Sequence, residues 1–511
     1  MVTCLKSCAL VGIDGRIVDV EVDVSSGMFS FDIVGLADTA VKESRERVRS
    51  ALKSVDIKMP AMKYTINLAP ANLKKEGVFY DLPIAMGIIA GLKIIDFPQL
   101  DLSMMLGELS LTGDIRKVDG VLPAAIAAKQ AGMTQIFVPE ANAYEAAVVD
   151  GLTVYPCKNL KQILDHFSGN TAIRPFVMNL EEYWKRSEDT ELDFSDVKGQ
   201  ENVKRALAVA AAGGHNCVMI GSPGTGKTML AKRIPSILPD LSFEEALEVT
   251  KIHSIAGILP EKTPLILKRP FRSPHHTVSI AGLSGGGSIP KPGEISLAHN
   301  GVLFLDEFPE FRKEALEILR QPLEDGSITV SRVHATLTYP CNFMLIASMN
   351  PCKCGYLGDP IHECTCSEHQ IKQYLSKISG PLLDRMDIHI EVNSVPYSDL
   401  ESSLPSTSSR EIKEQVNRAR EIQSKRFQST GIYSNSQMRP AHIQKYCKLG
   451  PAESALLQSA FERLGLSARA YDRILKVART IADLEGAESI GKTHISEAIQ
   501  YRSLDRKYWL R

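Results

Sequence analysis

The 511-residue sequence lacks an excess of charge of either sign, an apolar run long enough to span a bilayer, and a recognisable export signal. Lysine and arginine together number 59 and aspartate and glutamate 60, so nucleic-acid binding would need a local basic surface. No stretch approaches the roughly 20 apolar residues of a transmembrane helix. The first residues, Met1–Lys6, do not combine a charged segment with an apolar one, which argues against secretion. We therefore expect a cytoplasmic protein with no membrane partner.

The chain also lacks repeats and low-complexity tails, and its length predicts about three domains. An α/β domain is expected over residues 1–169, where Arg16–Val24 alternates like a half-buried strand. In the same domain we expect a helix over Thr39–Leu52, with Asp38 as its N-cap, and a buried helix over Leu82–Leu92. A linker (170–191), a nucleotide-binding core (192–395) and a helical region (396–511) follow. The Ser- and Pro-rich stretch Ser394–Ser409 marks the last boundary.

The clearest motif is a glycine-rich stretch between two apolar segments. Cys217–Ile220 before it is typical of a buried strand, and Met229–Lys232 after it is typical of a helix start. Backbone N–H groups in such a loop, together with the helix dipole, form an anion site. The pattern is that of a P-loop, in which Lys227 reaches the β- and γ-phosphates of ATP and Thr228 binds Mg²⁺. An ordinary glycine turn is the alternative. The predicted nucleotide-binding residues are Gly221, Ser222, Pro223, Gly224, Thr225, Gly226, Lys227 and Thr228.

Two further apolar stretches end in polar residues. Gly301–Leu305 leads into Asp306 and Glu307, and Leu345–Met349 leads into Asn350. Carboxylates at the end of a buried strand are costly unless they meet a cation. We therefore expect Asp306 to hold Mg²⁺ and Glu307 to orient and polarise the attacking water, with Asn350 beside the γ-phosphate. The alternatives are a solvated acidic turn and a turn asparagine before proline.

Ten cysteines in a chain expected to be cytoplasmic favour reduced thiols or a metal site over a disulfide framework. Four of them form two C-x-C pairs separated by nine residues, and the turn-forming residues Gly355–Pro360 lie between the pairs. Four thiolates can close a tetrahedral zinc site, and this zinc would be structural. His362 and His369 are possible substitute ligands, and four free thiols are the alternative. The predicted Zn²⁺ ligands are Cys352, Cys354, Cys364 and Cys366.

Residues Phe194–Glu391 resemble the AAA+ ATPases of the magnesium-chelatase/MCM branch, and within it the ComM/YifB family of bacterial helicases. The P-loop, Leu303–Glu307, Arg272–Thr277 and Gly380–Asp387 carry this resemblance, which extends over essentially the whole chain. It implies an α/β fold class: an AAA+ P-loop core with a parallel sheet, preceded by a Lon-protease-like α/β domain and followed by an all-α lid. It also implies a homo-hexameric ring with ATP between subunits. The segment Asp196–Gln200 resembles the one that lines the adenine pocket, which assigns Val197 and Gly199 to nucleotide binding.

The same resemblance assigns roles to two arginines. Arg385, in Leu382–Asp387, corresponds to the arginine finger that reaches the γ-phosphate of the neighbouring subunit, where it stabilises the charge of the departing phosphoryl group. Arg469 corresponds to the sensor-2 arginine of the lid, and Arg473 is a competing candidate for that role. The alternative for each is a surface ion pair.

Two segments are candidates for contact with DNA. The glycine-rich stretch Gly282–Gly293 corresponds to the helix-2 insert that projects into the ring pore. Ser327–Thr338 contains two alternating runs, typical of a hairpin, and resembles the pre-sensor-1 hairpin. Lys291, Arg332 and His334 are the expected phosphate contacts, because a ring multiplies a few cations aimed inward. A solvated surface role is the alternative for each.

The N-terminal domain resembles Lon protease over Lys75–Met86 and Gly107–Leu122. Lon catalysis needs a serine activated by a lysine, but at the positions that the resemblance matches to these two residues this sequence has Asp81 and Leu122. We therefore expect a Lon-like domain without peptidase activity.

The resemblance favours an ATP-dependent DNA motor, a helicase that promotes branch migration during recombination and natural transformation on single-stranded, double-stranded or branched DNA. One alternative is a chelatase motor subunit that drives Mg²⁺ insertion into a porphyrin. The others are an ATP-dependent Lon-like protease and a non-enzymatic DNA-binding ring.

Overall fold

The structure is a computed structural model that describes residues 2–95, 97, 100–184, 192–287, 290–332, 335–397, 406–428, 430–464, 467–504 and 508–509. The chain divides into two compact units. The first comprises Met1–Ser187 together with Phe243–Leu267, and the second comprises Glu188–Ser242 together with Lys268–Arg511.

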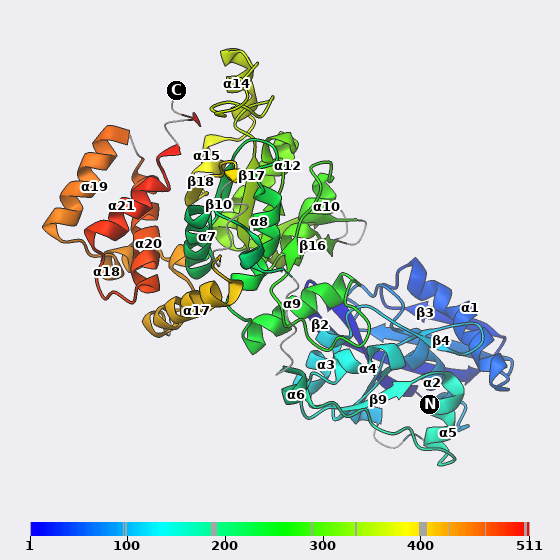
Figure 1. The fold of residues 1–511 in the computed structure, drawn as a ribbon. Coiled ribbons are helices and arrows are strands. Elements are labelled where there is room, and N and C mark those ends of the chain that lie inside the picture. The colour runs from blue at the N-terminus through cyan, green and yellow to red at the C-terminus, as the bar shows by residue number, and fades with distance from the viewer. Residues whose placement is uncertain are drawn as a thin grey trace. The chain divides into compact units, whose positions relative to one another are not determined.

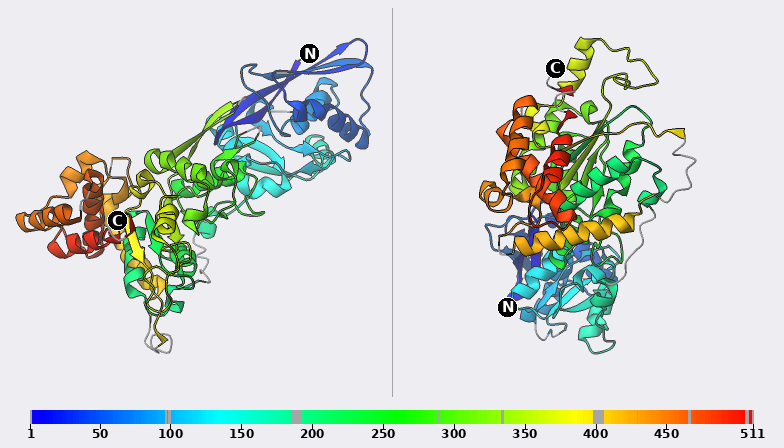
Figure 2. Two further views of the ribbon diagram at one scale, coloured as in Figure 1. Left: turned by 90° about the horizontal axis from the view of Figure 1, so that it is seen from above. Right: turned by 60° about the vertical axis from the view of Figure 1, so that its left-hand side comes forward.

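A mixed seven-stranded sheet forms the centre of the first unit (Figure 1). Its two long strands, β1 and β2, pair antiparallel and are drawn in blue in Figure 2. The alternation predicted for Arg16–Val24 is confirmed, because every second side chain of β2 from Val18 to Val24 is buried. The strands, in sheet order, are β3 (Ser30–Val34), β4 (Met62–Ala69), β2 (Asp14–Ser26), β1 (Val2–Val11), β5 (Ser103–Met105), β8 (Gln135–Pro139) and β9 (Thr153–Cys157).

Helices pack on this sheet, and two of them were predicted. Asp38 caps α1 by accepting a hydrogen bond from the Val41 backbone N–H at 2.8 Å, and α2 is buried along nearly its whole length. Both expectations are confirmed. The helices are α1 (Thr39–Ser54), α2 (Asp81–Gly91), α3 (Val121–Gln130), α4 (Ala143–Ala146), α5 (Leu160–Phe167) and α6 (Leu180–Trp184), and a short hairpin joins β6 (Glu108–Leu109) to β7 (Ile115–Arg116).

One segment of the region 192–395, which we expected to form a contiguous core, belongs to the first compact unit. Phe243–Leu267, which contains α9 (Phe243–Ile255), belongs to the first unit, and α9 packs beside α3 (Figure 1). Leu247 and Leu265 join an apolar cluster with Leu122, and the Ser254 hydroxyl donates a hydrogen bond to the buried Glu145 carboxylate. Burial of these apolar side chains in the first unit explains why the segment does not pack with the core residues that precede and follow it in sequence.

The second unit is built on a five-stranded sheet whose strands all run parallel. Its strands are short, and all but the first in sheet order are buried along almost their entire length, as the continuous apolar runs predict for a sheet covered on both faces. In sheet order they are β11 (Phe271–Arg272), β14 (Val302–Leu305), β17 (Met344–Met349), β10 (Cys217–Ile220) and β18 (Ile388–Glu391).

Helices of the core and of the C-terminal region share one apolar cluster with this sheet. The C-terminal helices, coloured from amber to red, gather together in Figure 1. The core helices in this cluster are α7 (Glu201–Gly213) and α8 (Lys227–Arg233). The core also contains α10 (Ile280–Ser284), α11 (Glu294–Leu297), α12 (Lys313–Ile318), α13 (Arg320–Asp325), α14 (Glu368–Leu375) and α15 (Gly380–Leu383). Those of the C-terminal region are α17 (Ser409–Arg426), α18 (Pro440–Tyr446), α19 (Pro451–Leu464), α20 (Ala468–Leu484) and α21 (Lys492–Gln500).

Two antiparallel hairpins complete the second unit. One pairs β12 (Gly285–Gly286) with β13 (Lys291–Pro292), and the other pairs β15 (Ser327–Arg332) with β16 (Ala335–Pro340), as the alternating pattern predicts. In the part of the chain that the structure describes, no helix combines the length and the apolar character that crossing a membrane requires.

Candidate nucleotide-binding site

The glycine-rich loop joins the end of β10, a central strand of the sheet, to the start of α8. Lys227 is the first residue of α8, and its Nζ donates hydrogen bonds to the Gly221 and Ser222 carbonyl oxygens at 2.7 and 2.8 Å. Burial lowers the pKa of Lys227 to about 8, although the nearby Asp306 carboxylate opposes the shift. The loop therefore holds a buried amine at a helix N-terminus, an arrangement that suits a phosphate group.

Two predicted magnesium ligands lie together. The Thr228 hydroxyl donates a hydrogen bond to Asp306 Oδ2 at 2.7 Å, which joins the start of α8 to the end of β14. Ser348 of β17 donates a second hydrogen bond, to Asp306 Oδ1. A hydroxyl and a carboxylate oxygen at this distance fit Mg²⁺, which takes oxygen ligands and is commonly bound by few protein groups plus phosphates. Sequence reasoning missed Ser348, whose only signal was a polar residue inside a buried apolar strand.

The polar residues at the ends of β14 and β17 contact different groups. Asn350 Oδ1 is 3.3 Å from Lys227 Nζ, so the sheet brings it to the P-loop. Glu307 has a left-handed backbone conformation (φ 53°), and its carboxylate is 3.1 Å from His276 Nδ1. His276 follows β11, the strand next to β14, so neighbouring strands explain this contact. Sequence reasoning assigned His276 no role, although it belongs to the Arg272–Thr277 motif.

The segment expected to line the adenine pocket precedes α7. Val197 is buried, and Gly199 has a left-handed backbone (φ 62°). Gln200 then donates a hydrogen bond from Nε2 to the Thr225 carbonyl oxygen at 3.0 Å. This bond connects the segment to the P-loop, so Val197 and Gly199 lie in the same region as the phosphate-binding residues.

The predicted arginines lie at the opposite edge of the sheet. The P-loop follows the end of β10, whereas Arg385 precedes the start of β18, which runs parallel to β10. Arg385 donates a hydrogen bond to the Pro381 carbonyl oxygen at 2.7 Å and pairs with Glu324. Arg469 Nη1 is 3.7 Å from the Asp384 carboxylate. The fold therefore groups Arg385 with Arg469 and separates both from the P-loop of the same chain.

Arg473, the competing lid arginine, is half-buried in a polar network. Its guanidinium is 2.9 Å from Asp387 Oδ1, and the other carboxylate oxygen is 3.0 Å from His215 Nδ1. Burial alone would raise the pKa of the Asp387 carboxyl, but the Arg473 guanidinium and the His215 contact hold it well below its usual range. These contacts give Arg473 a structural partner, whereas the Arg469 side chain is 69% exposed, so Arg469 is better placed to reach outside its own chain.

The two hairpins expected to contact DNA lie next to each other. Lys291 of β13 pairs with Gly286 of β12, and a Cβ built on Gly286 would lie 2.9 Å from Arg332 Nη2. Lys291 and Arg332 are both exposed, so the hairpins bring two cations to one surface. His334, which follows β15 in sequence, lies outside the described residues.

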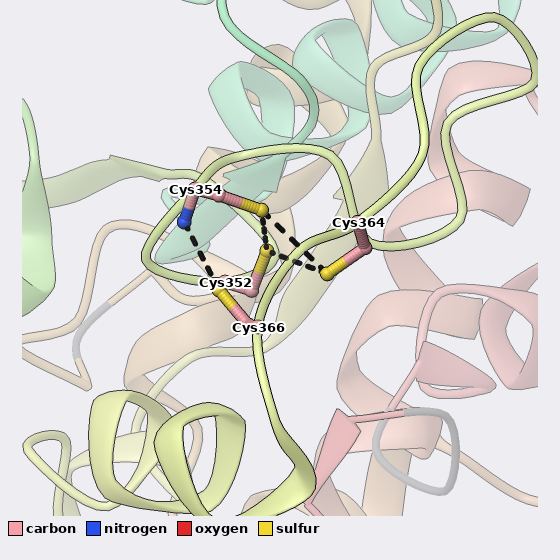
Figure 3. A group of neighbouring side chains, drawn as sticks. All are labelled: Cys352, Cys354, Cys364 and Cys366. Atoms are coloured by element: carbon pink, nitrogen blue, oxygen red, sulfur yellow. Dashed lines mark hydrogen bonds between the residues drawn. The ribbon is translucent and has the colours of Figure 1, made fainter.

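The four predicted zinc ligands converge (Figure 3). Their sulfur atoms lie within 4.8 Å of one another. Cys352 Sγ is 3.3 Å from Cys354 Sγ, and Cys364 Sγ is 3.6 Å from each of them. These separations are close to roughly 3.8 Å, the edge of a tetrahedron with Zn–S bonds of about 2.3 Å. The donor set therefore fits Zn²⁺.

One thiol of this cluster differs electrostatically from the others. Burial alone would raise the pKa of Cys354, but hydrogen bonds from the Tyr356 backbone and from Cys352 outweigh it and lower that pKa to about 6. The pKa values of Cys352, Cys364 and Cys366 are raised instead. The cluster therefore favours at least one thiolate, which is the form that binds metal.

Comparison with known proteins assigns the family. Three family models match in succession: "Subunit ChlI of Mg-chelatase" over residues 20–142, "Magnesium chelatase, subunit ChlI" over 193–400, and "Magnesium chelatase, subunit ChlI C-terminal" over 406–502. The chain is 43% identical to "Competence protein ComM" of Haemophilus influenzae over 508 residues, which cover 98% of this chain and 97% of the relative. It is also 43% identical to "Uncharacterized protein YifB" of Escherichia coli, over 98% of this chain and 96% of the relative.

The chain belongs to the ComM/YifB family of magnesium-chelatase-like AAA+ proteins. Similarity to a chelatase subunit itself is weaker: the "Magnesium-chelatase 38 kDa subunit" of Rhodobacter capsulatus is 23% identical over 59% of this chain and 84% of that protein. The predicted fold class, a Lon-like α/β domain before an AAA+ core and a helical C-terminal domain, is confirmed for this ComM/YifB protein.

The Lon-like domain of this ComM/YifB protein holds a buried ion pair at Asp81, the residue that the sequence resemblance matches to the Lon nucleophile. Asp81 is fully buried, and Arg47 Nε lies 2.6 Å from its Oδ2. The Ser44 hydroxyl and the Leu109 backbone N–H also donate hydrogen bonds to this carboxylate. Leu122, which the sequence resemblance matches to the Lon lysine, belongs to the apolar cluster that includes Leu265. A paired carboxylate and an apolar side chain supply neither a nucleophile nor a base for acyl transfer.

Proposed function

We propose that this protein is an ATP-dependent DNA motor, a homo-hexameric helicase that promotes branch migration during recombination and natural transformation. The observation that carries the proposal is the position of Lys227, Thr228, Asp306 and Asn350 at one edge of the sheet, with Arg385 and Arg469 at the other. One chain thus offers half of an ATP site at each edge. A closed ring joins these halves between subunits.

Each residue of the site has a separate role in ATP hydrolysis. The P-loop and Lys227 bind and orient the phosphates. Thr228 and Asp306 would hold Mg²⁺, which neutralises charge on the phosphates when it is bound. Glu307 orients and polarises the attacking water, and Asn350 helps to position it. Arg385 of the neighbouring subunit stabilises charge on the departing phosphoryl group, with Arg469 beside it. Such electrostatic stabilisation supplies most of the rate in phosphoryl transfer.

DNA is the proposed polymer, and the adjacent hairpins are its proposed contacts. Lys291 and Arg332 lie on neighbouring hairpins of one unit, and His334 is assigned to the same surface from the sequence. A ring would repeat this pair of cations around its pore, where a few phosphate contacts per subunit suffice for binding. The relative named as a competence protein, matched over nearly its whole length, supports a role in natural transformation.

A structural Zn²⁺ at Cys352, Cys354, Cys364 and Cys366 is part of the proposal. The separations between the sulfur atoms support it. A closed four-thiolate site stabilises the loop that carries it and leaves no open position for catalysis. We expect about one zinc per chain in protein purified without a chelator.

The main alternative is a chelatase motor subunit that drives Mg²⁺ insertion into a porphyrin. The family models carry chelatase names, which favours it. The chelatase subunit of Rhodobacter capsulatus, however, matches 59% of this chain at 23% identity, against 98% at 43% for the competence protein. A Lon-like protease is disfavoured by the Arg47–Asp81 pair, and a non-enzymatic DNA-binding ring by the complete set of ATPase residues.

The experiment that tests the DNA-binding hairpins is the double variant Lys291→Ala with Arg332→Ala. Basal ATP hydrolysis is expected to persist, because neither residue belongs to the P-loop or to the residues assigned to Mg²⁺ and water. DNA affinity should fall about equally for all sequences, since phosphates carry no base identity. The slope of log affinity against log salt should become shallower, by up to about one unit for each phosphate that the variant no longer neutralises.

Lys313→Ala serves as the matched control, because Lys313 is an exposed cation on a helix of the same unit, outside both hairpins. Unchanged DNA affinity, salt slope and strand separation in the double variant would exclude these hairpins as the DNA-binding elements. It would leave the ATPase assignment standing.

A further inference from the structure

The loop that carries the four cysteines also lies against the P-loop. Gly355 is where the two loops meet: its backbone is left-handed (φ +91°), and a Cβ built on it would lie 2.7 Å from both Cγ and Cδ of Pro223. Real Cβ atoms do not approach carbon atoms so closely, so any other residue would displace the P-loop or its own backbone. The cysteine loop thus approaches the P-loop as closely as glycine allows.

A second interaction joins the same two loops. The side chain of Ser222, the second residue of the P-loop, faces the Asp359 carboxylate and is the largest of the influences that hold the pKa of Asp359 well below its usual range. Its carboxylate also accepts the backbone N–H groups of Ile361 and His362, both at 2.9 Å. Only 4% of the Asp359 side chain is exposed. Backbone N–H groups of its own loop therefore hold an ionised carboxylate beside Ser222.

Gly355 and Asp359 both lie in the segment enclosed by Cys354 and Cys364, whose sulfur atoms are 3.6 Å apart. A metal ion that binds both sulfurs closes this segment into a ring. Closing a loop removes conformational freedom that an open loop keeps. The shape of the segment, and with it the position of Gly355 and Asp359 against the P-loop, therefore depends on whether the cysteine cluster is closed.

We propose that metal binding at the four cysteines and nucleotide binding at the P-loop are energetically coupled through Gly355 and Asp359. The inference rests on the proposed zinc and ATP sites, and it assigns Asp359 as a positioning residue for the P-loop. Coupling between two binding sites is reciprocal: if zinc strengthens nucleotide binding, nucleotide strengthens zinc binding by the same factor. The cysteine cluster then influences the nucleotide affinity of the motor, in addition to stabilising a loop.

The test measures Mg²⁺–ADP affinity by calorimetry on the full-length chain, with its zinc content determined by elemental analysis. Stripping zinc with a chelator and restoring Mg²⁺ should weaken ADP binding about tenfold, the factor that corresponds to about 1.4 kcal/mol. Asp359→Ala at full zinc content should weaken it by a similar factor, and Asp359→Asn by less, because an amide oxygen can still accept from the Ile361 and His362 backbone N–H groups and face Ser222.

Two further readouts separate positioning from general damage to the fold. In Asp359→Ala, removing zinc should have little additional effect on ADP affinity, since the carboxylate that carries the coupling is already absent. At saturating ATP the turnover number should stay near that of the unchanged protein, so that KM rises and kcat does not. Glu363→Gln is the matched control, because it neutralises an exposed carboxylate in the same loop. It should change neither the ADP affinity nor the zinc affinity.

Each failure has a distinct signature. Protein that binds one zinc per chain, with ADP affinity unaffected by zinc removal and by Asp359→Ala, would overturn the coupling and leave both proposed sites intact. Protein that binds ADP but no zinc would remove the metal site and the coupling with it. Protein that binds zinc but neither ADP nor ATP would refute the proposed ATPase instead.

Discussion

The depressed pKa of Lys227 makes nucleotide affinity depend on pH in a range where most lysines do not titrate. Burial lowers this pKa to about 8, compared with about 10.4 for an exposed lysine. Phosphate groups placed beside Nζ favour its charged form, so nucleotide binding should raise the pKa again. Binding that raises the pKa of a group is therefore strongest at low pH. It weakens as the pH rises above the pKa that the group has in the free protein.

The size of the effect follows from the protonated fraction. With a pKa near 8, roughly nine-tenths of the lysines carry a proton at pH 7 and roughly one-tenth at pH 9. If the phosphates bind well only to the charged amine, Mg²⁺–ADP affinity should fall about tenfold over this range, which corresponds to about 1.4 kcal/mol. The phosphate groups themselves, with a second pKa near 6, contribute little above pH 7.

Calorimetric titration of the full-length protein with Mg²⁺–ADP at several pH values checks this prediction. Lys227→Arg is the control, since its guanidinium stays charged throughout, and whatever affinity remains should be nearly independent of pH from 7 to 9. An affinity of the unchanged protein that is flat over the same range would refute the reasoning. So would an equal decline in the arginine variant.

Other substitutions test separate parts of the site. Glu307→Gln should keep nucleotide binding and slow hydrolysis by at least about 100-fold, because the amide is a poor base; hydrolysis at the normal rate would show that Glu307 is not the water-activating residue. Arg385→Ala should bind nucleotide almost normally yet turn over about 1,000-fold more slowly, and mixing it with Lys227→Ala subunits should restore part of that turnover. Robust hydrolysis by a strictly monomeric preparation would contradict the shared site. In the Lon-like domain, Arg47→Ala should destabilise the fold by about 3–5 kcal/mol, because it leaves the buried Asp81 carboxylate unpaired, and thermal unfolding of the variant would detect this.

Much of the fold and of the nucleotide site could be predicted because the signals are local in sequence. The strands β10, β14 and β17 are continuous apolar runs, and each ends in the residues that the chemistry needs. Parallel strands bring their carboxyl ends to one edge of the sheet, so the proximity of Lys227, Asp306 and Asn350 follows from the pattern. The four cysteines could be grouped for a similar reason, because a turn-forming segment lies between their two pairs.

What could not be predicted depends on packing between segments distant in sequence. The apolar side chains of Phe243–Leu267 join the first unit, which no local pattern indicates. His276, Ser348 and Asp359 touch site residues only because neighbouring strands and loops bring them there. The grouping of Arg469 with Arg385 depends on how α20 packs against the turn before β18, and the sequence of α20 does not encode that packing on its own.

The measurement that tests the central claim most directly is ATP hydrolysis by the full-length protein, assayed alone and with single-stranded, double-stranded or branched DNA. The proposed motor predicts a basal rate that DNA stimulates, together with strand separation or branch migration that Glu307→Gln abolishes. A rate indifferent to every DNA, but stimulated by a porphyrin-chelating complex, would contradict the DNA motor and favour the chelatase alternative.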